Sequence, residues 1–183
     1  MKKVAVILAE GFEEIEALTS VDVLRRAGAI ASIVGLNDVN IKGCHNICVK
    51  ADVTLREMKE LDYDAIVLPG GLPGASNLAN DTRLKAILQN FDKSNKLICA
   101  ICAAPMVLES AGVLKDHFVC YPGFEENVRS DKRGYVSDKN VLKDQNIITG
   151  KGPAFSMEFA LFIVKNLLGD EAYLKVKNDL LYK

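Results

Sequence analysis

The chain alternates short apolar runs with longer segments in which apolar residues recur at the spacing of a helix. The opening run is KVAVILA at residues 3–9, and Ile15, Leu18, Val21 and Leu24 follow it at helical intervals. Such runs are typical of strands buried on both faces, as in a parallel sheet. The pattern predicts strands at residues 3–9, 30–36, 64–68 and 96–101, and weaker ones near residues 118–121, 134–136 and 147–149.

Helices are predicted between these strands. The first ends near Gly28, a favourable C-terminal stop, and Asp81 is placed to cap a helix that runs to about Phe91. Thr54 and Glu57 have the spacing of a capping box, which predicts a short helix. Further helices are expected at residues 103–111, 156–168 and 171–180.

This alternation predicts the fold class. Strands that alternate with helices imply right-handed crossovers and a mostly parallel sheet with helices on both faces. We therefore expect an α/β, doubly wound sandwich formed by a single domain, residues 1–183. Residues 41–53 break the alternation, and we expect them to form a small hairpin at one edge of the sheet.

Composition limits the functional classes. The 183 residues are 49% hydrophobic and 26% charged, and 23 basic against 24 acidic residues give a formal charge of -1. These values are close to those of soluble domains and offer no basic surface, so we expect neither nucleic acid nor membrane as a partner. The first apolar run is too short for a secretion signal, and the five cysteines form no disulfide-rich pattern. We therefore expect a cytoplasmic protein.

Cys102 is the first candidate for chemistry, because ligands bind at the carboxyl ends of the strands in sheets of this kind. It falls between the strand at 96–101 and the following helix, and the alanines around it suit a sharp strand-to-helix turn. A helix N-terminus favours a thiolate, so we predict a reactive thiol with a pKa well below that of free cysteine. The alternative is a buried structural cysteine at a tight turn.

Three carboxylates follow the first predicted strand. Glu13, Glu14 and Glu16 all suit the first turn of a helix, where negative charge complements the helix dipole. A functional role requires one of them to point toward Cys102, and periodicity alone does not choose among them.

Two glycines follow the strand at 64–68. The amides of Gly70 and Gly71, together with that of Ala103, are candidates for an oxyanion hole, because glycine permits close backbone approach. The simpler interpretation is a tight turn after a strand.

The remaining cysteines suggest two other chemistries, and we reject both. Cys99 and Cys102 match C-x-x-C, but a strand places their Cα atoms about 10 Å apart, at about 3.3 Å per residue. A disulfide tolerates about 7 Å. Cys44, His45 and Cys48 form a partial set of metal ligands that no second Cys/His pair completes. We therefore expect no metal and interpret these three as hairpin residues.

The whole chain resembles the ThiJ/PfpI superfamily, in the branch that contains the parkinsonism-associated protein deglycase. The resemblance implies a flavodoxin-like fold of the class I glutamine amidotransferase type. It rests on short motifs that are highly specific in combination: GFEEIE at 11–16, VDVLRRAG at 21–28, LPGG at 68–71, AICAAP at 100–105 and GPAFSMEFAL at 152–161.

The resemblance also implies roles and activities. It makes Cys102 the reactive thiol and Glu16 its protonated carboxyl partner, and it places the oxyanion amides at Gly71 and Ala103. It implies a homodimer with the sites near the interface and no cofactor. Activities in the family include a glyoxalase that converts methylglyoxal to lactate and a deglycase that acts on early glycation adducts. Peroxide sensing and chaperone-like protection also occur among relatives.

The sequence departs from the family at two positions. Peptidase-like members carry a histidine directly after the nucleophile, where this chain has Ala103, so a peptidase is disfavoured. The deglycase branch often has a histidine where this chain has Tyr121. His45 and His117 cannot replace it, since His117 lies about 13 Å away along an extended strand. Tyrosine is a poor base at neutral pH, so acid–base work is expected to fall on Glu16.

Two functions follow from these residues. The first is a cofactor-free, cysteine-dependent enzyme, a hydrolase or lyase of the glyoxalase or deglycase type that acts on small reactive carbonyls. The second is a redox-responsive stress protein or chaperone with little turnover, in which Cys102 is oxidised to sulfinate. A binding module with an inert cysteine is the least favoured interpretation.

Overall fold

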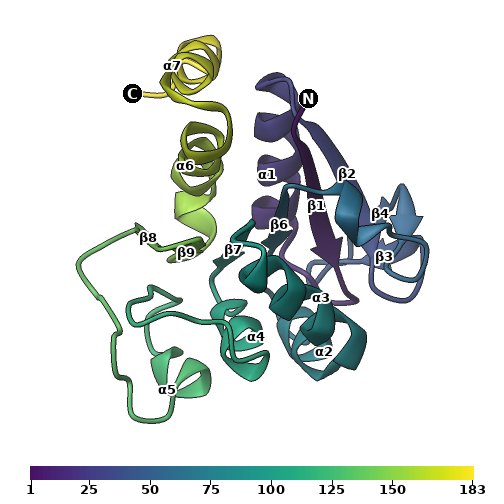
Figure 1. Cartoon of the computed structure of the whole chain (residues 1–183), viewed down its shortest axis with the longest axis vertical. Helices are drawn as coiled ribbons and strands as arrows, with labels where there is room; N and C mark the ends of the chain where they lie inside the picture. Colours follow the sequence, from purple (N-terminus) through teal and green to yellow (C-terminus); the bar gives the residue numbers. More distant parts are fainter.

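A seven-stranded sheet forms the centre of the computed structural model, which describes all residues, 1–183 (Figure 1). Its strand order is β5-β2-β1-β6-β7-β9-β8, and every neighbouring pair is parallel except β8 and β9. The predicted α/β fold class is therefore confirmed. The strands span β1 Lys3–Leu8, β2 Ile30–Gly35, β5 Val53–Thr54, β6 Ala65–Leu68, β7 Leu97–Ile101, β8 Val141–Asp144 and β9 Ile147–Gly150.

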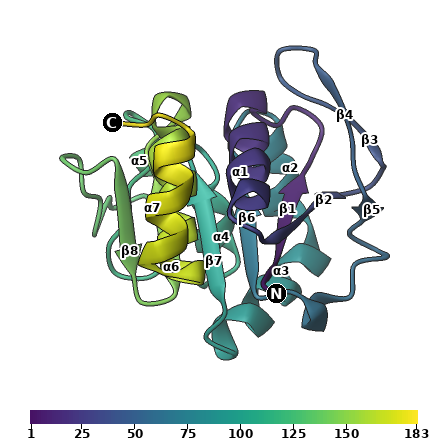
Figure 2. The same cartoon turned by 90° about the horizontal axis from the view of Figure 1, so that it is seen from above.

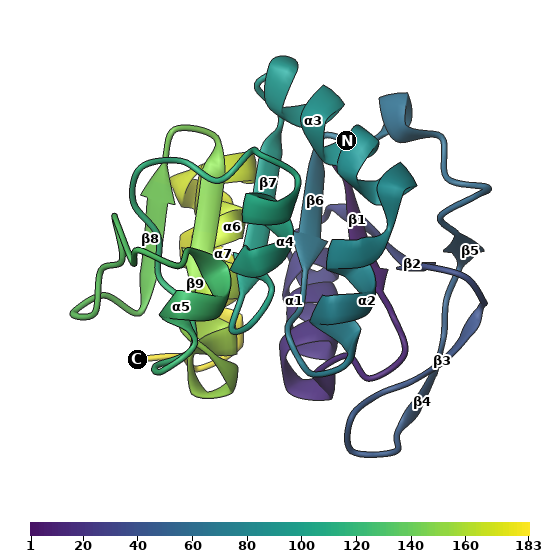
Figure 3. The same ribbon diagram turned by 90° about the horizontal axis from the view of Figure 1, so that it is seen from below.

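Helices cover both faces of this sheet. On one face lie α1 (Glu14–Arg26) and α6 (Ser156–Leu168), with α7 (Asp170–Asp179) packed on α6 (Figure 2). The opposite face carries α2 (Gly74–Asn80), α3 (Thr82–Lys93) and α4 (Pro105–Ser110), seen in front in Figure 3. A one-turn helix, α5 (Glu125–Val128), and two 3-10 turns, Glu60–Asp62 and Pro153–Phe155, complete the structure. No helix combines the length and the apolar character needed to cross a membrane.

The two faces explain the unbroken apolar runs of the central strands. Successive side chains of a strand point to opposite faces of the sheet. In β1, Val4, Val6 and Leu8 pack with residues of α1 and α6, whereas Ala5 and Ile7 pack with residues of α3 and α4. Both faces of β1 are thus core.

The predicted edge hairpin is present. Strands β3 (Asn40–Lys42) and β4 (Cys48–Lys50) pair antiparallel in a sheet of their own, which lies on the side of the main sheet that ends in β2 and β5 (Figure 3). The amide of Gly11 donates to the carbonyl of Lys42 at 2.8 Å. The hairpin is therefore tied to the loop that follows β1.

The helix predicted from the capping box at Thr54 is wrong. The amide and Oγ1 of Thr54 donate to the Glu57 carboxylate at 3.0 and 2.7 Å, and these bonds close a turn rather than start a helix. Conversely, α2 was not predicted, because its sequence GASNLAN consists largely of small and polar residues that are typical of loops. The cap predicted at Asp81 is confirmed, since its carboxylate accepts from the Leu84 amide at 2.7 Å.

The segment from residue 118 to residue 144 also differs from the prediction. The strands expected near 118–121 and 134–136 reduce to a single bridge between Phe118 and Tyr135. Strand β8 was missed, because its sequence VLKD lacks the continuous apolar character of a central strand. It lies at the edge of the sheet, where one side of the strand faces solvent.

Candidate active site

Cys102 lies on a sharp bend directly after β7. Its φ is +64°, in the left-handed region that non-glycine residues rarely occupy, so the backbone here is strained. Two hydrogen bonds hold it there: the Cys102 amide donates to Gly150, and the Tyr121 amide donates to the Cys102 carbonyl, both at 3.0 Å. Helix α4 begins only at Pro105, so the start predicted at residue 103 is wrong, and a turn separates the thiol from the helix.

Glu16 is the carboxylate that faces this bend. It lies in the first turn of α1 and is 0% exposed, whereas its neighbour Ile15 is 57% exposed. Its Oε2 accepts from the Gly70 amide at 2.7 Å, and its Oε1 is buried without a hydrogen-bond partner. Glu13 and Glu14 instead face the hairpin. Of the three carboxylates, Glu16 is therefore the one that points toward Cys102.

Gly70 is the point around which these groups converge. A Cβ atom at this position would lie 2.7 Å from the Cys102 Cβ and 2.9 Å from both the Ala103 nitrogen and the Glu16 Oε2. Real Cβ contacts do not become this short, and two of these three atoms belong to groups that could not move without dismantling the site. Glycine is therefore required here by space rather than by its φ angle.

Two backbone amides remain free beside the thiol. The Gly70 amide donates to Glu16 and so is not available to an oxyanion. The amides of Gly71 and Ala103 face the Cys102 sulfur and act to lower its pKa, and neither donates to a backbone carbonyl. These two amides are the candidate oxyanion donors.

Burial dominates the electrostatics of Glu16. It raises the pKa of this carboxyl from its ordinary value of 4.5 to about 7. The Gly70 amide and the Cys102 side chain act in the opposite direction but do not cancel the effect, and the negative charge of Glu13 adds to it. Glu16 therefore exchanges its proton near neutral pH.

The predicted low pKa of the Cys102 thiol is wrong for this geometry. Burial raises the pKa, and the negative charge of Glu16 raises it further, while the amides of Ala103 and Gly71 offset only part of the effect. A helix that starts three residues later does not outweigh burial beside a carboxylate. The thiol and the carboxyl are best treated as a coupled pair that passes from two protons to one near neutral pH.

A pocket of about 290 Å³ lies beside the bend. It is lined by Tyr121, Pro122 and residues 151–155, and Tyr121 is half exposed. A second pocket, of about 310 Å³, lies near Lys2 and Asp64, at the amino-terminal ends of the strands. Neither Cys102 nor Glu16 lines the pocket beside Tyr121, but it adjoins the bend through the bond from the Tyr121 amide to the Cys102 carbonyl, and ligands of doubly wound sheets bind at this end of the strands, which makes it the candidate substrate site.

Neither histidine belongs to this site. His117 is exposed and lies 3.5 Å from Asp144 on β8. His45 lies on the hairpin, where it and Cys44 approach Glu14. Tyr121 thus has no neighbouring histidine, as the sequence predicted. The approach of Glu14 to the hairpin was not predicted, because about thirty residues separate the start of α1 from the hairpin loop and no motif spans both.

A match to a protein-family model identifies the family of this chain. Residues 2–166 match the model of the DJ-1/PfpI family. This chain belongs to the DJ-1/PfpI family. The resemblance inferred from the sequence motifs is thereby confirmed.

Curated DJ-1/PfpI relatives cover the chain almost completely. The Parkinson disease protein 7 homolog of Danio rerio is 38% identical over 185 residues, which is 100% of this chain and 98% of the relative. The glutathione-independent glyoxalase DJR-1.2 of Caenorhabditis elegans is 36% identical over 172 residues, which is 93% of this chain and 91% of the relative.

Solved DJ-1 structures confirm the flavodoxin-like fold. The crystal structure of Drosophila melanogaster DJ-1beta matches with a TM-score of 0.95 and 37% identity, covering 100% of this chain and 98% of that chain. Oxidized Toxoplasma gondii DJ-1 matches with a TM-score of 0.92 and 36% identity, covering 100% and 99%.

Glu16→Gln should change the pH dependence of stability. The folded protein holds the Glu16 proton up to about pH 7 and the unfolded chain only to about 4.5, so folding binds a proton between these values. The parent should therefore lose about 3 kcal/mol of unfolding free energy between pH 4 and pH 8 at this site. Glu16→Gln cannot titrate and should lack this loss.

Urea denaturation at both pH values measures the effect, with Glu10→Gln as the control for an exposed carboxylate near the same end of β1. An equal pH dependence in the parent and Glu16→Gln would show that Glu16 titrates normally.

Proposed function

We propose that this protein is a cofactor-free, cysteine-dependent enzyme that acts on small reactive carbonyls. The reaction is of the glyoxalase type, methylglyoxal to lactate, with repair of early glycation adducts as a related activity. One observation carries the proposal: the buried carboxyl of Glu16, with a pKa of about 7, faces Cys102 beside the two free amides of Gly71 and Ala103. The glyoxalase named among its relatives supports the proposal at the level of the family.

The first step is addition of Cys102 to the aldehyde carbon. As the carbon–sulfur bond forms, the thiol proton passes to the Glu16 carboxylate, so the addition does not require a free thiolate beforehand. The carbonyl π electrons move to the aldehyde oxygen, where the amides of Gly71 and Ala103 stabilise the negative charge. Glu16 then protonates this oxygen and becomes a carboxylate again.

Glu16 next moves a proton between the two substrate carbons. Its carboxylate removes the proton from the carbon bonded to sulfur, which gives an enediolate, and returns this proton to the neighbouring carbon, while the hydroxyl proton of the first carbon passes to the oxygen of the second. The product is a thioester between lactate and Cys102. Water hydrolyses this thioester, releasing lactate and restoring the thiol, so methylglyoxal gains one water overall. A pKa of about 7 suits a group that must accept and return protons at neutral pH.

Three substitutions test the mechanism through lactate formed from methylglyoxal. Cys102→Ser should abolish turnover, and Glu16→Gln should lower it by about 10²–10⁴-fold, which is the usual value of a positioned acid–base group. Tyr121→His should leave the rate unchanged or raise it, because it supplies the base that this chain lacks at the pocket. Steady-state methylglyoxal consumption with lactate quantified gives the rates.

Glu10→Gln is again the matched control, since Glu10 is exposed and its carboxylate accepts from the Lys42 amide of the hairpin. Near-parent turnover in Glu16→Gln would remove Glu16 from the mechanism. No lactate from the folded parent would reject the glyoxalase proposal itself.

An alternative function is that of a redox-responsive stress protein or chaperone. Two observations favour it: the Cys102 side chain is only partly buried, and a solved relative, Toxoplasma gondii DJ-1, is described as oxidized. In this function the thiolate is oxidised by peroxide to sulfinate, and the Glu16 carboxyl and the free amides stabilise the new oxygens.

Mild peroxide should add two oxygens to Cys102. Cys99 and Cys120 are fully buried and should remain reduced, so the competing sites are Cys48, which is exposed on the hairpin, and Cys44, which is partly buried there. Intact mass and peptide mapping should show the gain in the parent and in Cys48→Ser but not in Cys102→Ser. A gain located on Cys48 alone would argue against the redox function.

We also propose a homodimer located in the cytoplasm. Apolar side chains are exposed beside the site: Ile15 and Leu18 on α1 are 57% and 38% exposed, and Ile47, whose amide approaches Glu14, is 52% exposed. A second copy would cover them. All five cysteines are free, which suits a reducing compartment.

Light scattering after gel filtration tests the dimer. The parent should have twice the 20.0 kDa mass of the chain. Leu18→Glu should shift it toward the mass of one chain, because a buried unpaired charge opposes association. Leu61→Glu, at an 85% exposed position elsewhere on the surface, should not. A parent with the mass of a single chain would refute the dimer.

A further inference from the structure

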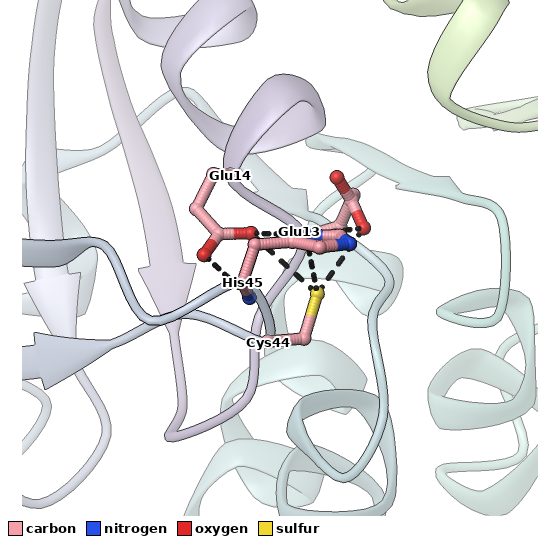
Figure 4. Close-up of side chains that lie close together, drawn as sticks. All are labelled: Glu13, Glu14, Cys44 and His45. Carbon is pink, nitrogen blue, oxygen red and sulfur yellow. Dashed lines mark hydrogen bonds and ion pairs between the residues drawn. The ribbon is translucent and has the colours of Figure 1, made fainter.

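Two segments far apart in the sequence bring four metal-ligating side chains together outside the active site (Figure 4). Glu13 and Glu14 stand at the start of α1, and Cys44 and His45 lie in the loop between β3 and β4. The Cys44 Sγ is 3.2 Å from the Glu13 Oε2 and 3.2 Å from the His45 Nδ1. The His45 Nδ1 is 2.9 Å from the Glu14 Oε2.

The backbone holds these side chains in place. The Cys44 amide donates to the carbonyl of Phe12 at 2.9 Å, and the His45 amide donates to the Glu14 Oε1 at 2.8 Å. Gly43 leaves room for the Glu14 carboxyl, which would lie 2.3 Å from a Cβ atom at this position and would have to move away. The cluster is therefore part of how the hairpin is attached to α1, not a contact between free side chains.

The spacing fits a four-coordinate ion. Bond lengths of about 2.0–2.3 Å to zinc in tetrahedral geometry place the ligand atoms about 3.3–3.7 Å from one another. The four candidate atoms all lie within 4.8 Å of one another, and the His45 Nδ1 to Glu13 Oε2 distance is 3.7 Å. Small side-chain rotations would bring all four to bonding distance of one centre.

The two buried carboxylates of the cluster favour binding of a cation. Glu13 is 8% and Glu14 is 4% exposed, and carboxylates this buried are almost always paired. No lysine or arginine forms an ion pair with Glu13 or Glu14. The one basic side chain that pairs with them is that of His45, which is 68% exposed. A divalent ion would bind both carboxylates, the lone pair of a neutral imidazole and the sulfur of Cys44, which would release its proton, and its two positive charges would offset most of the negative charge of the site.

We propose that Glu13, Glu14, Cys44 and His45 bind a divalent transition-metal ion of the zinc class. The thiolate and the imidazole favour such ions over Mg²⁺ and Ca²⁺, which prefer all-oxygen sites. The two carboxylates complete the set that Cys44 and His45 alone left unfinished. The prediction of no metal from the sequence rested on the lack of a second Cys/His pair, and carboxylates take that place.

Cobalt(II) is the probe, because a thiolate–Co²⁺ bond absorbs in the near ultraviolet and tetrahedral Co²⁺ absorbs in the visible. The reduced parent, freed of metal by a chelator, should bind one Co²⁺ per chain with both bands, and added Zn²⁺ should remove them. Cys44→Ala should lose the thiolate band. His45→Ala and Glu13→Gln should bind Co²⁺ at least about tenfold more weakly. A loss of this size already follows when a residue that only hydrogen-bonds a metal ligand is changed.

Cys48→Ala and Cys102→Ala are the matched controls. Cys48 is exposed on the same hairpin, and Cys102 belongs to the site already described, so both variants should bind Co²⁺ as the parent does. Circular dichroism confirms that each variant is folded. The proposal is overturned if the folded parent shows no thiolate band at equimolar Co²⁺, if the band persists in Cys44→Ala, or if it disappears in Cys102→Ala.

Discussion

The candidate active site depends on the cost of burying a charge. Glu16 is fully enclosed, and water cannot solvate its carboxylate, so its ionised form is stabilised chiefly by the amide of Gly70. That single bond does not replace hydration, and the pKa of the carboxyl rises to about 7 as a result. The same burial keeps the Cys102 thiol protonated while Glu16 is charged. A buried pair that shares a proton in this way can exchange it with a substrate at neutral pH.

The fold brings this pair together by placing three segments at one edge of the sheet. The segments that follow β1, β6 and β7 carry Glu16, in the first turn of α1, Gly70 and Cys102, and these strands are neighbours in the order β1-β6-β7. Neighbouring parallel strands end at the same edge, so residues far apart in sequence meet there. The space at Gly70, which no side chain fills, is what allows the three groups to approach one another.

Sequence reasoning predicted the architecture because burial on both faces leaves a strong pattern. The four central strands and α6 were found almost to the residue, and the position of the bend at Cys102 followed from the strand that precedes it. The edge strand β8 and helix α2 were missed, since neither is fully buried and local composition outweighs periodicity in such segments. The thiol pKa was predicted with the wrong sign. Its direction depends on the burial and charge of Glu16, which no local motif records.

The two edges of the sheet have a consequence for how the molecule associates. At one edge β5 contributes only two residues, and at the other the antiparallel β8 carries Lys143 and Asp144. Very short strands and charged side chains are the usual means by which proteins prevent another chain from adding a strand to an open edge. The sheet therefore offers little template for cross-β aggregation, even though its central strands are apolar and rich in β-branched residues. In the proposed dimer, contact between the two copies would therefore fall to the helices and the hairpin, whose surfaces can meet without extending the hydrogen-bonded ladder.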